Sequence, residues 1–316
     1  MTQPGFSKSK KRYRDFKSFL VERFGCRVYK LQIDAGFTCP NRDGTLAAGG
    51  CAYCDGRGSA LRLKGPLPPV EEQIRAGKAL YRNLRGAAKF IAYFQTFTNT
   101  YAPVERLRAL YDEALAQPDV VGLSVGTRPD CVDDDTLRLL EGCAKRSHVW
   151  VEYGLQSIHD RTLKRINRGH DAAAFVEAVR RTAGRGLFIC AHVILGLPGE
   201  TRADMLETAR AVAALPIDGI KVHSLLALRG TEVGRLFEEG KIELMTQEDY
   251  VSAVCDVLEL LPPSVVVQRI TAEGYRDIYL GPDWAQNKLK VLNAIDRELE
   301  KRDTYQGARY KVTGNR

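Results

Sequence analysis

Short apolar runs alternate with longer amphipathic stretches along most of the chain. The apolar runs predict six strands, at Val28–Ile33, Phe90–Phe94, Val121–Val125, Val149–Leu155, Phe188–Leu195 and Gly219–His223. The stretches between them, with apolar residues at helical spacing, predict helices at Val70–Leu84, Val104–Ala116, Asp133–Ala144, Ala172–Arg185 and Thr201–Ala214. Several of the strands are apolar almost throughout, which is typical of parallel strands covered on both faces.

The regular order of strand and helix favours parallel strands joined by right-handed crossovers. Six such units are too few to close an eight-stranded barrel, so we expect an α/β fold with a partial (β/α)6 barrel of the TIM type. The barrel core covers residues 26–235 and follows a basic N-terminal helical extension, residues 1–25, with a helix at roughly Tyr13–Phe24. Residues 236–316 form a C-terminal α/β extension, with a helix around Thr246–Leu261, an apolar run at Val265–Ile270 and a last helix near Trp284–Lys301.

The net charge of +8 is concentrated at the two ends of the chain. Residues 1–30 contain nine Lys or Arg against two acidic residues, and residues 284–316 contain eight against four. Two basic ends around a near-neutral body indicate either a polyanionic partner such as nucleic acid or simply two solvated termini. The candidate phosphate contacts are Lys8, Lys10, Lys11, Arg12 and Arg14.

The cellular compartment bears on how the eight cysteines are interpreted. The polar, basic N-terminus does not resemble a secretory signal, and no apolar stretch is long enough to span a membrane, so we expect a cytoplasmic protein with no membrane partner. A reducing cytoplasm disfavours disulfides, so a tight group of cysteines there indicates metal binding or catalysis. For the scattered Cys131, Cys143, Cys190 and Cys255 we expect small, buried apolar side chains.

Cys39, Cys51 and Cys54 share one glycine-containing loop directly after the first predicted strand. Three thiolates can hold one face of a [4Fe–4S] cubane and leave one iron open to another ligand. A structural zinc ion would need four protein ligands, and the only further thiol within reach is Cys26, across the first strand. Zinc binding and three merely structural cysteines therefore remain as weaker alternatives.

The segment Cys51-Ala-Tyr-Cys54 resembles the end of the radical S-adenosylmethionine (SAM) signature. The eleven residues between Cys39 and Cys51 resemble the widened spacing found in the branch related to the Elongator catalytic subunit. The resemblance covers about residues 25–235 and continues at Tyr93–Tyr101, Thr127–Asp130, Glu152–Ser157, Gly196–Thr201 and Arg229–Thr231. Within this branch the chain resembles the bacterial YhcC/YtqA group, and the stretch Ala294–Glu300 also resembles that group.

The resemblance implies a radical SAM enzyme that binds a [4Fe–4S] cluster and S-adenosylmethionine. The reduced cluster would cleave SAM to a 5′-deoxyadenosyl radical, which abstracts hydrogen from the substrate. An electron donor such as flavodoxin or ferredoxin is implied as a partner. Together with the basic ends, the resemblance to the Elongator branch indicates tRNA as a partner and modification of a wobble-uridine side chain as the reaction. Full Elongator chemistry is not expected, because no acetyltransferase domain follows the barrel.

The resemblance also assigns site residues. The three cysteines would hold the cluster, and the residues expected to contact SAM are Tyr53, Thr98, Gln156, Arg168 and His192. Arg168 would clamp the SAM carboxylate, because a planar guanidinium meets a carboxylate with two hydrogen bonds. Gly126 departs from the Elongator pattern, which has a glutamate at this position before Thr-Arg-Pro-Asp, so another group such as Thr98 must meet the SAM amino group.

Arg168, His192 and a third residue, Glu152, each have an alternative interpretation that involves no cofactor. Arg168 could be a surface cation, and His192 could be a core imidazole with its hydrogen bonds satisfied. Glu152 is the candidate catalytic residue, because a carboxylate in an apolar strand is costly to bury unless it is paired. It could face the substrate or pair with an arginine of a neighbouring strand.

Two other kinds of function remain open at this point. One is a radical SAM enzyme acting on a small molecule such as a porphyrin-like metabolite, and the other is a non-catalytic iron–sulfur protein for electron transfer or sensing.

Overall fold

The computed structural model describes residues 11–57 and 66–311. Seven parallel strands form one curved sheet in the order β1-β2-β3-β4-β5-β6-β8. These strands are β1 (Val28–Ile33), β2 (Lys89–Phe94), β3 (Val120–Thr127), β4 (His148–Gln156), β5 (Phe188–Leu195), β6 (Gly219–Ser224) and β8 (Val266–Arg269). A small antiparallel pair, β7 (Ala227–Leu228) and β9 (Tyr279–Gly281), lies beyond the sheet.

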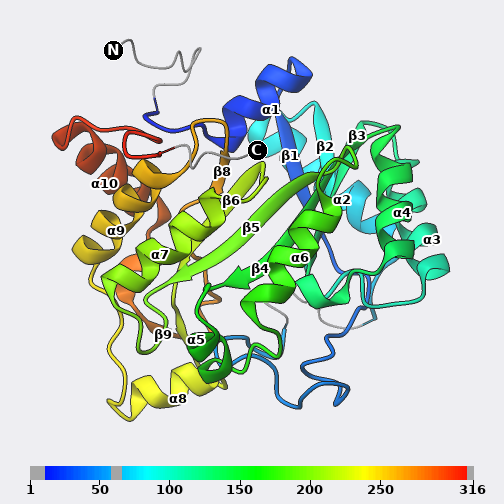
Figure 1. Ribbon diagram of the computed structural model, residues 1–316. Coiled ribbons are helices and arrows are strands. Elements are labelled where there is room, and N and C mark those ends of the chain that lie inside the picture. Colours follow the sequence, from blue (N-terminus) through cyan, green and yellow to red (C-terminus); the bar gives the residue numbers. More distant parts are fainter. Residues whose placement is uncertain (1–10, 58–65, 312–316) are drawn as a thin grey trace.

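Helices cover the outer face of the curved sheet, as Figure 1 shows for α4, α6 and α7. The helices of the barrel are α1 (Phe16–Phe24), α2 (Val70–Arg85), α3 (Val104–Leu115), α4 (Asp134–Ala144), α5 (Asp160–Arg165), α6 (Ala172–Thr182) and α7 (Arg202–Ala213). The C-terminal part adds α8 (Glu232–Glu238), α9 (Gln247–Leu260) and α10 (Lys288–Lys301). Short 3-10 turns occupy Pro129–Cys131 and Asp283–Gln286.

The predicted α/β fold with a partial barrel is confirmed, and all six predicted strands form. The barrel sheet differs from the prediction in having a seventh strand. The apolar run predicted at Val265–Ile270 becomes β8, which pairs parallel with β6 and so extends the barrel sheet to a seventh strand. The C-terminal segment therefore contributes directly to the barrel wall.

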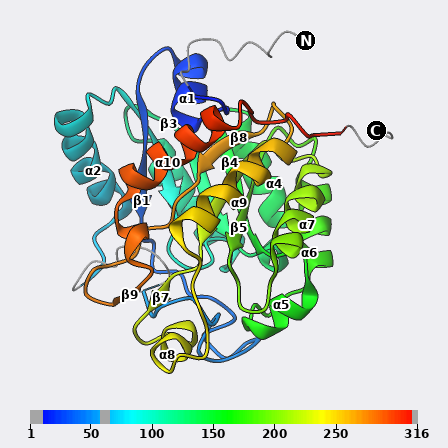
Figure 2. The ribbon, with the colours of Figure 1, turned by 90° about the vertical axis from the view of Figure 1, so that its left-hand side faces the viewer.

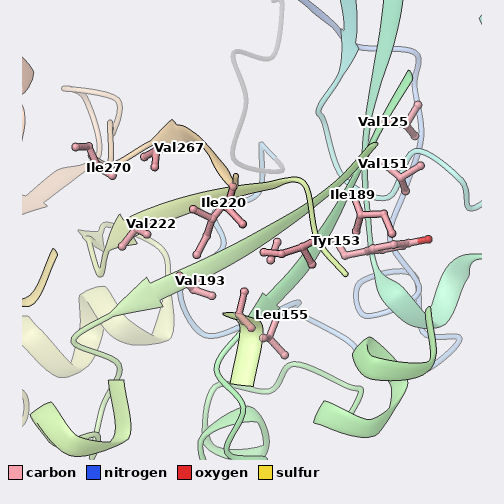
Figure 3. Close-up of a cluster of buried hydrophobic side chains, with 14 of the residues drawn as sticks. Val125, Val151, Tyr153, Leu155, Ile189, Val193, Ile220, Val222, Val267 and Ile270 are labelled. Carbon is pink, nitrogen blue, oxygen red and sulfur yellow. The ribbon is translucent and has the colours of Figure 1, made fainter. Parts of the chain in front are cut away.

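Alternate residues of each strand point outward and pack against the helices. On β4 these are Val151, Tyr153 and Leu155, and on β5 they are Ile189 and Val193, all buried in one core cluster (Figure 3). Cys143 and Cys255 are buried in the same cluster, and Cys190 is buried in a smaller one, as expected for small apolar side chains. Cys131 is only half-buried, so for this residue the expectation is wrong.

Helix α1 closes the end of the barrel at which the strands begin. Phe19 and Leu20 pack with side chains from the first halves of the strands, Val28, Ile91, Trp150, Cys190 and Val266. The Asp15 side chain caps the helix by accepting a hydrogen bond from the Ser18 N–H, and the Asp15 backbone bridges to β8. The basic helix thus lies at the opposite end of the barrel from the loops that follow the strands (Figure 1).

The segment before α1 is joined to the C-terminal part of the chain. Lys11 forms an ion pair with Asp296 of α10, and Arg12 pairs with Asp303 at 3.1 Å. The Arg14 side chain donates to the Ser264 carbonyl at 2.9 Å. Lys8 and Lys10 lie outside the described residues. Figure 2 shows α9 and α10 packed side by side below α1.

Among the helices of residues 11–57 and 66–311, none has the length and apolar character that crossing a membrane requires.

Candidate active site

A cavity of about 260 Å³ opens at the end of the barrel where the strands finish. Its wall contains all nine residues predicted to bind the cofactors or act in catalysis: Cys39, Cys51, Tyr53, Cys54, Thr98, Glu152, Gln156, Arg168 and His192. The fold therefore brings together side chains that are up to 153 residues apart in the sequence, from 39 to 192. What each side chain does there remains a prediction.

Backbone hydrogen bonds shape the cysteine loop. The Arg42 N–H donates to the Cys39 carbonyl at 2.8 Å, and the Cys54 N–H donates to the Cys51 carbonyl at 2.9 Å. Between the last two cysteines, Ala52 is held on both sides, since its N–H donates to the Ile166 carbonyl and its carbonyl accepts from the Val233 N–H. The loop is thereby fixed against the segment after α5 and against α8.

Cys51 is the most deeply buried of the three candidate ligands, with 8% of its surface exposed, while Cys39 and Cys54 are half-buried. Asn41 Nδ2 and Arg168 Nη1 each donate to Cys51 Sγ at 3.5 Å. Burial alone would raise the pKa of the Cys51 thiol, but the charge and hydrogen bond of Arg168 outweigh it and lower the pKa. The thiolate form, which binds iron, is therefore favoured.

These features fit an iron–sulfur cluster better than zinc. The three cysteines of the loop all line the wall of the cavity. Cys26, the fourth ligand that a zinc site would need, lies before β1 and packs with α1 at the opposite end of the barrel. The cysteine loop could therefore hold a cluster with three protein ligands, whose remaining iron is available to SAM.

Arg168 is a buried residue rather than a surface cation, since only 6% of it is exposed. Besides Cys51, its guanidinium holds the Gly154 carbonyl through Nε at 3.2 Å and Nη2 at 2.6 Å. A Cβ at position 154 would lie 2.6 Å from Arg168 Nη2 and 2.7 Å from Gln156 Nε2, so this close approach requires glycine. Gln156 itself has a φ of 76°, a strained value for a non-glycine residue in a cavity wall.

Tyr53 and Thr98 lie on two sides of the cavity. The Tyr53 ring packs against the apolar cluster that contains Leu163 and Ile194, and burial raises the pKa of its hydroxyl well above the ordinary value. Thr98 is 1% exposed, and its N–H donates to the Thr38 carbonyl at 3.2 Å. Gly126 lines the same cavity, so the position without the Elongator-type glutamate does face the site.

Glu152 lies at the centre of a polar layer inside the barrel. Its carboxylate accepts hydrogen bonds from Lys30 of β1, Ser124 of β3 and Lys221 of β6, and from His192 Nε2 of β5 at 2.8 Å. Of the two alternatives left open by the sequence, the pairing is therefore formed, with two lysines in place of an arginine, and Glu152 also lines the cavity. Burial would raise the pKa of Glu152, but Lys221 and Lys30 hold it well below the ordinary value, so the carboxylate stays ionised.

His192 combines the two interpretations that the sequence left open. It lines the cavity, yet it also donates to Glu152, which is the partner expected of a satisfied buried imidazole. Burial and the charge of Lys221 lower the pKa of His192 to about 4, so the ring is neutral at physiological pH. His223 stacks beside it with ring centroids 6.0 Å apart.

Sequence reasoning missed most of this layer. Each of the seven strands of the sheet contributes one member to the layer, and these are Lys30, Tyr93, Ser124, Glu152, His192, Lys221 and Gln268. Lys221 Nζ also donates to Tyr93 Oη at 2.8 Å, and Lys30 Nζ donates to Gln268 Oε1 at 2.7 Å. Lys221 lies between Ile220 and Val222, and so carried the same signal as Glu152, a charged residue between two apolar neighbours in a strand.

A model of the radical SAM superfamily matches residues 39–212, and a model of the radical SAM C-terminal domain matches residues 217–301. The chain belongs to the radical SAM superfamily. This radical SAM protein is 46% identical over 302 residues to the uncharacterized protein YtqA of Bacillus subtilis, covering 96% of this chain and 94% of YtqA. Protein YhcC of Escherichia coli is 39% identical over 285 residues, covering 90% of this chain and 91% of YhcC.

More distant relatives support the Elongator-like branch. The tRNA uridine(34) acetyltransferase of Dehalococcoides mccartyi is 27% identical over 73% of this chain, and the match spans 52% of that protein. Among solved structures, an N-terminally truncated Elp3 of Methanocaldococcus infernus superposes with a TM-score of 0.67 at 16% identity, over 88% of this chain and 64% of that one. The superposition confirms the fold, and the relatives confirm the predicted group.

As a radical SAM enzyme, the protein uses a [4Fe–4S] cluster and S-adenosylmethionine. In the arrangement described above, the cysteine loop could hold the cluster at the cavity wall and Arg168 could reach a carboxylate beside it. The polar layer lies deeper in the barrel, where a substrate that entered the cavity would meet Glu152, His192 and Lys221.

Proposed function

We propose that this enzyme modifies the side chain of a wobble uridine in tRNA by radical chemistry. The observation that carries the proposal is the cavity itself, which brings the three cysteines and a charged polar layer to one barrel mouth. Similarity to a tRNA uridine(34) acetyltransferase supports a uridine substrate. Since that match spans about half of the relative, the proposal is restricted to the radical step. A base flipped out of the anticodon loop could enter such a cavity.

The chemistry divides between cofactor and protein. The bound cluster and SAM supply the radical that abstracts hydrogen from the substrate, and an electron donor of the flavodoxin or ferredoxin class is part of the proposal. The protein excludes water and orients the substrate. Because Glu152 stays ionised and His192 neutral, we assign them to holding the substrate and Lys221 in place rather than to acid catalysis. Burial lowers the pKa of Lys221 to about 8, which leaves it mostly protonated at neutral pH.

Mass spectrometry of tRNA nucleosides tests the proposal in a strain that lacks this protein. We expect one modified wobble uridine to disappear and its less modified precursor to accumulate. Expression of the wild-type chain should restore the nucleoside, and expression of the Cys54→Ala variant should not. An unchanged nucleoside profile would contradict the proposal and favour a radical SAM enzyme for a small molecule.

The basic N-terminus gives a second test of tRNA binding. If Lys8, Lys10, Lys11, Arg12 and Arg14 hold phosphates, replacing all five with alanine should weaken binding of every tRNA alike. The slope of log affinity against log salt should flatten by up to about one unit for each lost phosphate contact. Filter binding over a salt series measures both quantities.

The ion pairs of this segment require a more selective variant. Lys11, Arg12 and Arg14 are bonded to the C-terminal part, so their loss could also loosen the structure. The Lys8→Ala/Lys10→Ala double variant leaves those bonds in place and should retain part of the effect. Arg138→Ala/Arg146→Ala, which removes two exposed cations elsewhere, is the matched control. Equal slopes for all variants would show that the N-terminus does not bind phosphates.

A further inference from the structure

Asn41 is a buried polar residue directly beside a candidate cluster ligand. None of its surface is exposed, although it belongs to a loop whose next residue, Arg42, is partly exposed. Its Nδ2 donates to Cys51 Sγ at 3.5 Å and to the Asn167 carbonyl at 2.6 Å. Asn41 Oδ1 has no hydrogen-bond partner among the described residues, so the amide is held by its Nδ2 alone. The two acceptors around Nδ2, the Asn167 carbonyl and Cys51 Sγ, fix the orientation of the amide with its donor towards the sulfur.

Arg168 adds a second donor and a positive charge to the same sulfur. Its Nη1 lies 3.5 Å from Cys51 Sγ, and its guanidinium cannot swing away without losing the two hydrogen bonds to the Gly154 carbonyl. Arg128 lies behind it and donates to the Arg168 carbonyl at 2.8 Å. Cys51 is therefore surrounded by hydrogen-bond donors and cationic charge in a largely water-free environment.

We propose that Asn41 and Arg168 are positioning residues that raise the reduction potential of the cluster through their hydrogen bonds to Cys51 Sγ. Reduction adds one electron from the external donor and no proton, so the extra negative charge is spread over the cluster and its sulfur ligands. Donors aimed at a ligand sulfur stabilise this reduced form, and hydrogen bonds to ligand atoms tune metal centres in this way. The inference rests on Cys51 being a cluster ligand and is independent of the substrate.

A purely structural role for Asn41 is the alternative, because the residue also joins the cysteine loop to the segment after α5. Asn167 provides a matched control for that role. Its side-chain Nδ2 donates to the Gly50 carbonyl at 2.8 Å and so joins the same two segments without touching sulfur. Asn167 has a φ of 51°, which glycine adopts readily, so Asn167→Gly removes the side-chain bond while the backbone conformation is retained.

The experiment is a redox titration of the anaerobically reconstituted full-length protein without SAM, followed by the electron paramagnetic resonance signal of the reduced cluster. Asn41→Leu, which has similar volume and no donor, should lower the ratio of reduced to oxidised cluster at a fixed potential about tenfold, equivalent to about 59 mV for one electron. Asn41→Asp should shift the potential further in the same direction, because it replaces the donor with an acceptor. Asn167→Gly should keep the wild-type potential.

Two results would overturn the inference. One is a wild-type potential in both Asn41 variants at full iron content, and the other is an equal shift in Asn167→Gly. Should neither Asn41 variant take up iron, Arg168→Met tests the second donor on the same sulfur and should also lower the potential. If Cys51→Ala retained a complete cluster, the ligand role of Cys51 would fail, which is a separate outcome from a failure of tuning.

Discussion

Replacing Cys39, Cys51 or Cys54 with alanine will remove most of the iron from the anaerobically reconstituted protein. The wild-type chain should be brown and contain about four irons, because three thiolates on one loop hold one cubane. The loss should be nearly complete for each single variant, since two remaining thiolates leave a second iron without a protein ligand. Iron and sulfide analysis together with the visible absorption spectrum measures the effect.

Cys143→Ala and Cys255→Ala are the matched controls for this prediction. Both thiols are buried in the main core cluster, away from the cavity wall, and their loss should leave the iron content unchanged. Stoichiometric zinc without iron after anaerobic reconstitution would contradict the cluster assignment. Full iron content in any of the three loop variants would show that the ligand set is different.

The barrel was predictable because its strands are covered on both faces. Strands such as Phe188–Leu195 are apolar on the outer face and largely on the inner one, so they stand out as continuous apolar runs. β8 was recognised only as an apolar run after the barrel, because its pairing with β6 joins positions 219 and 266, which are 47 residues apart. No local pattern specifies a pairing over that distance.

The same limit applies to the site. The cysteines are close in sequence, and Glu152 stood out as a charge in an apolar strand. Lys30 and Gln32 alternate with apolar residues in the same strand, a pattern that also fits a strand with one face in solvent. Only the folded sheet shows that Lys30 meets Glu152. Asn41 carries no signal of its own, because its contact with Cys51 depends on how the loop closes.

Charge alone also did not say at which end of the barrel the basic helix lies. Phe19 and Leu20 pack α1 against the end of the barrel at which the strands begin, so the apolar residues of the helix decide where it lies. Its cations therefore lie away from the cavity, at the end of the barrel opposite the cysteine loop. A tRNA that touched both regions would have to extend along the side of the barrel.

Glu152→Gln is expected to destabilise the protein strongly, by about 3–5 kcal/mol, because it leaves two buried cations without a counter-charge. The Glu152 side chain is fully buried, Lys221 is 5% exposed and Lys30 is 14% exposed, so solvent screens the two uncompensated cations only weakly. Denaturation in urea, followed by circular dichroism at neutral pH, measures the change in unfolding free energy.

The dependence on pH gives this prediction a second, independent check. The pKa of Glu152 is lowered well below its ordinary value of 4.5, so the unfolded chain takes up a proton at higher pH than the native one. The stabilisation is therefore fully present above about pH 4.5 and is lost as the pH falls towards the lower native pKa. The difference in unfolding free energy between the wild type and Glu152→Gln should therefore become smaller below about pH 4.5.

A variant at the protein surface shows whether the loss of stability in Glu152→Gln exceeds that caused by removing an exposed ion pair. Glu141→Gln removes the partner of Arg185 on the outside of the barrel, where the two side chains are 34% and 32% exposed, and should cost less than about 1 kcal/mol. The double variant Glu152→Gln/Lys221→Met should recover part of the stability lost in Glu152→Gln, because it removes one of the two unpaired cations. If Glu152→Gln cost no more than Glu141→Gln, the carboxylate would not be the centre of the polar layer, and the arrangement of Lys30, Lys221 and His192 around it would have to be revised.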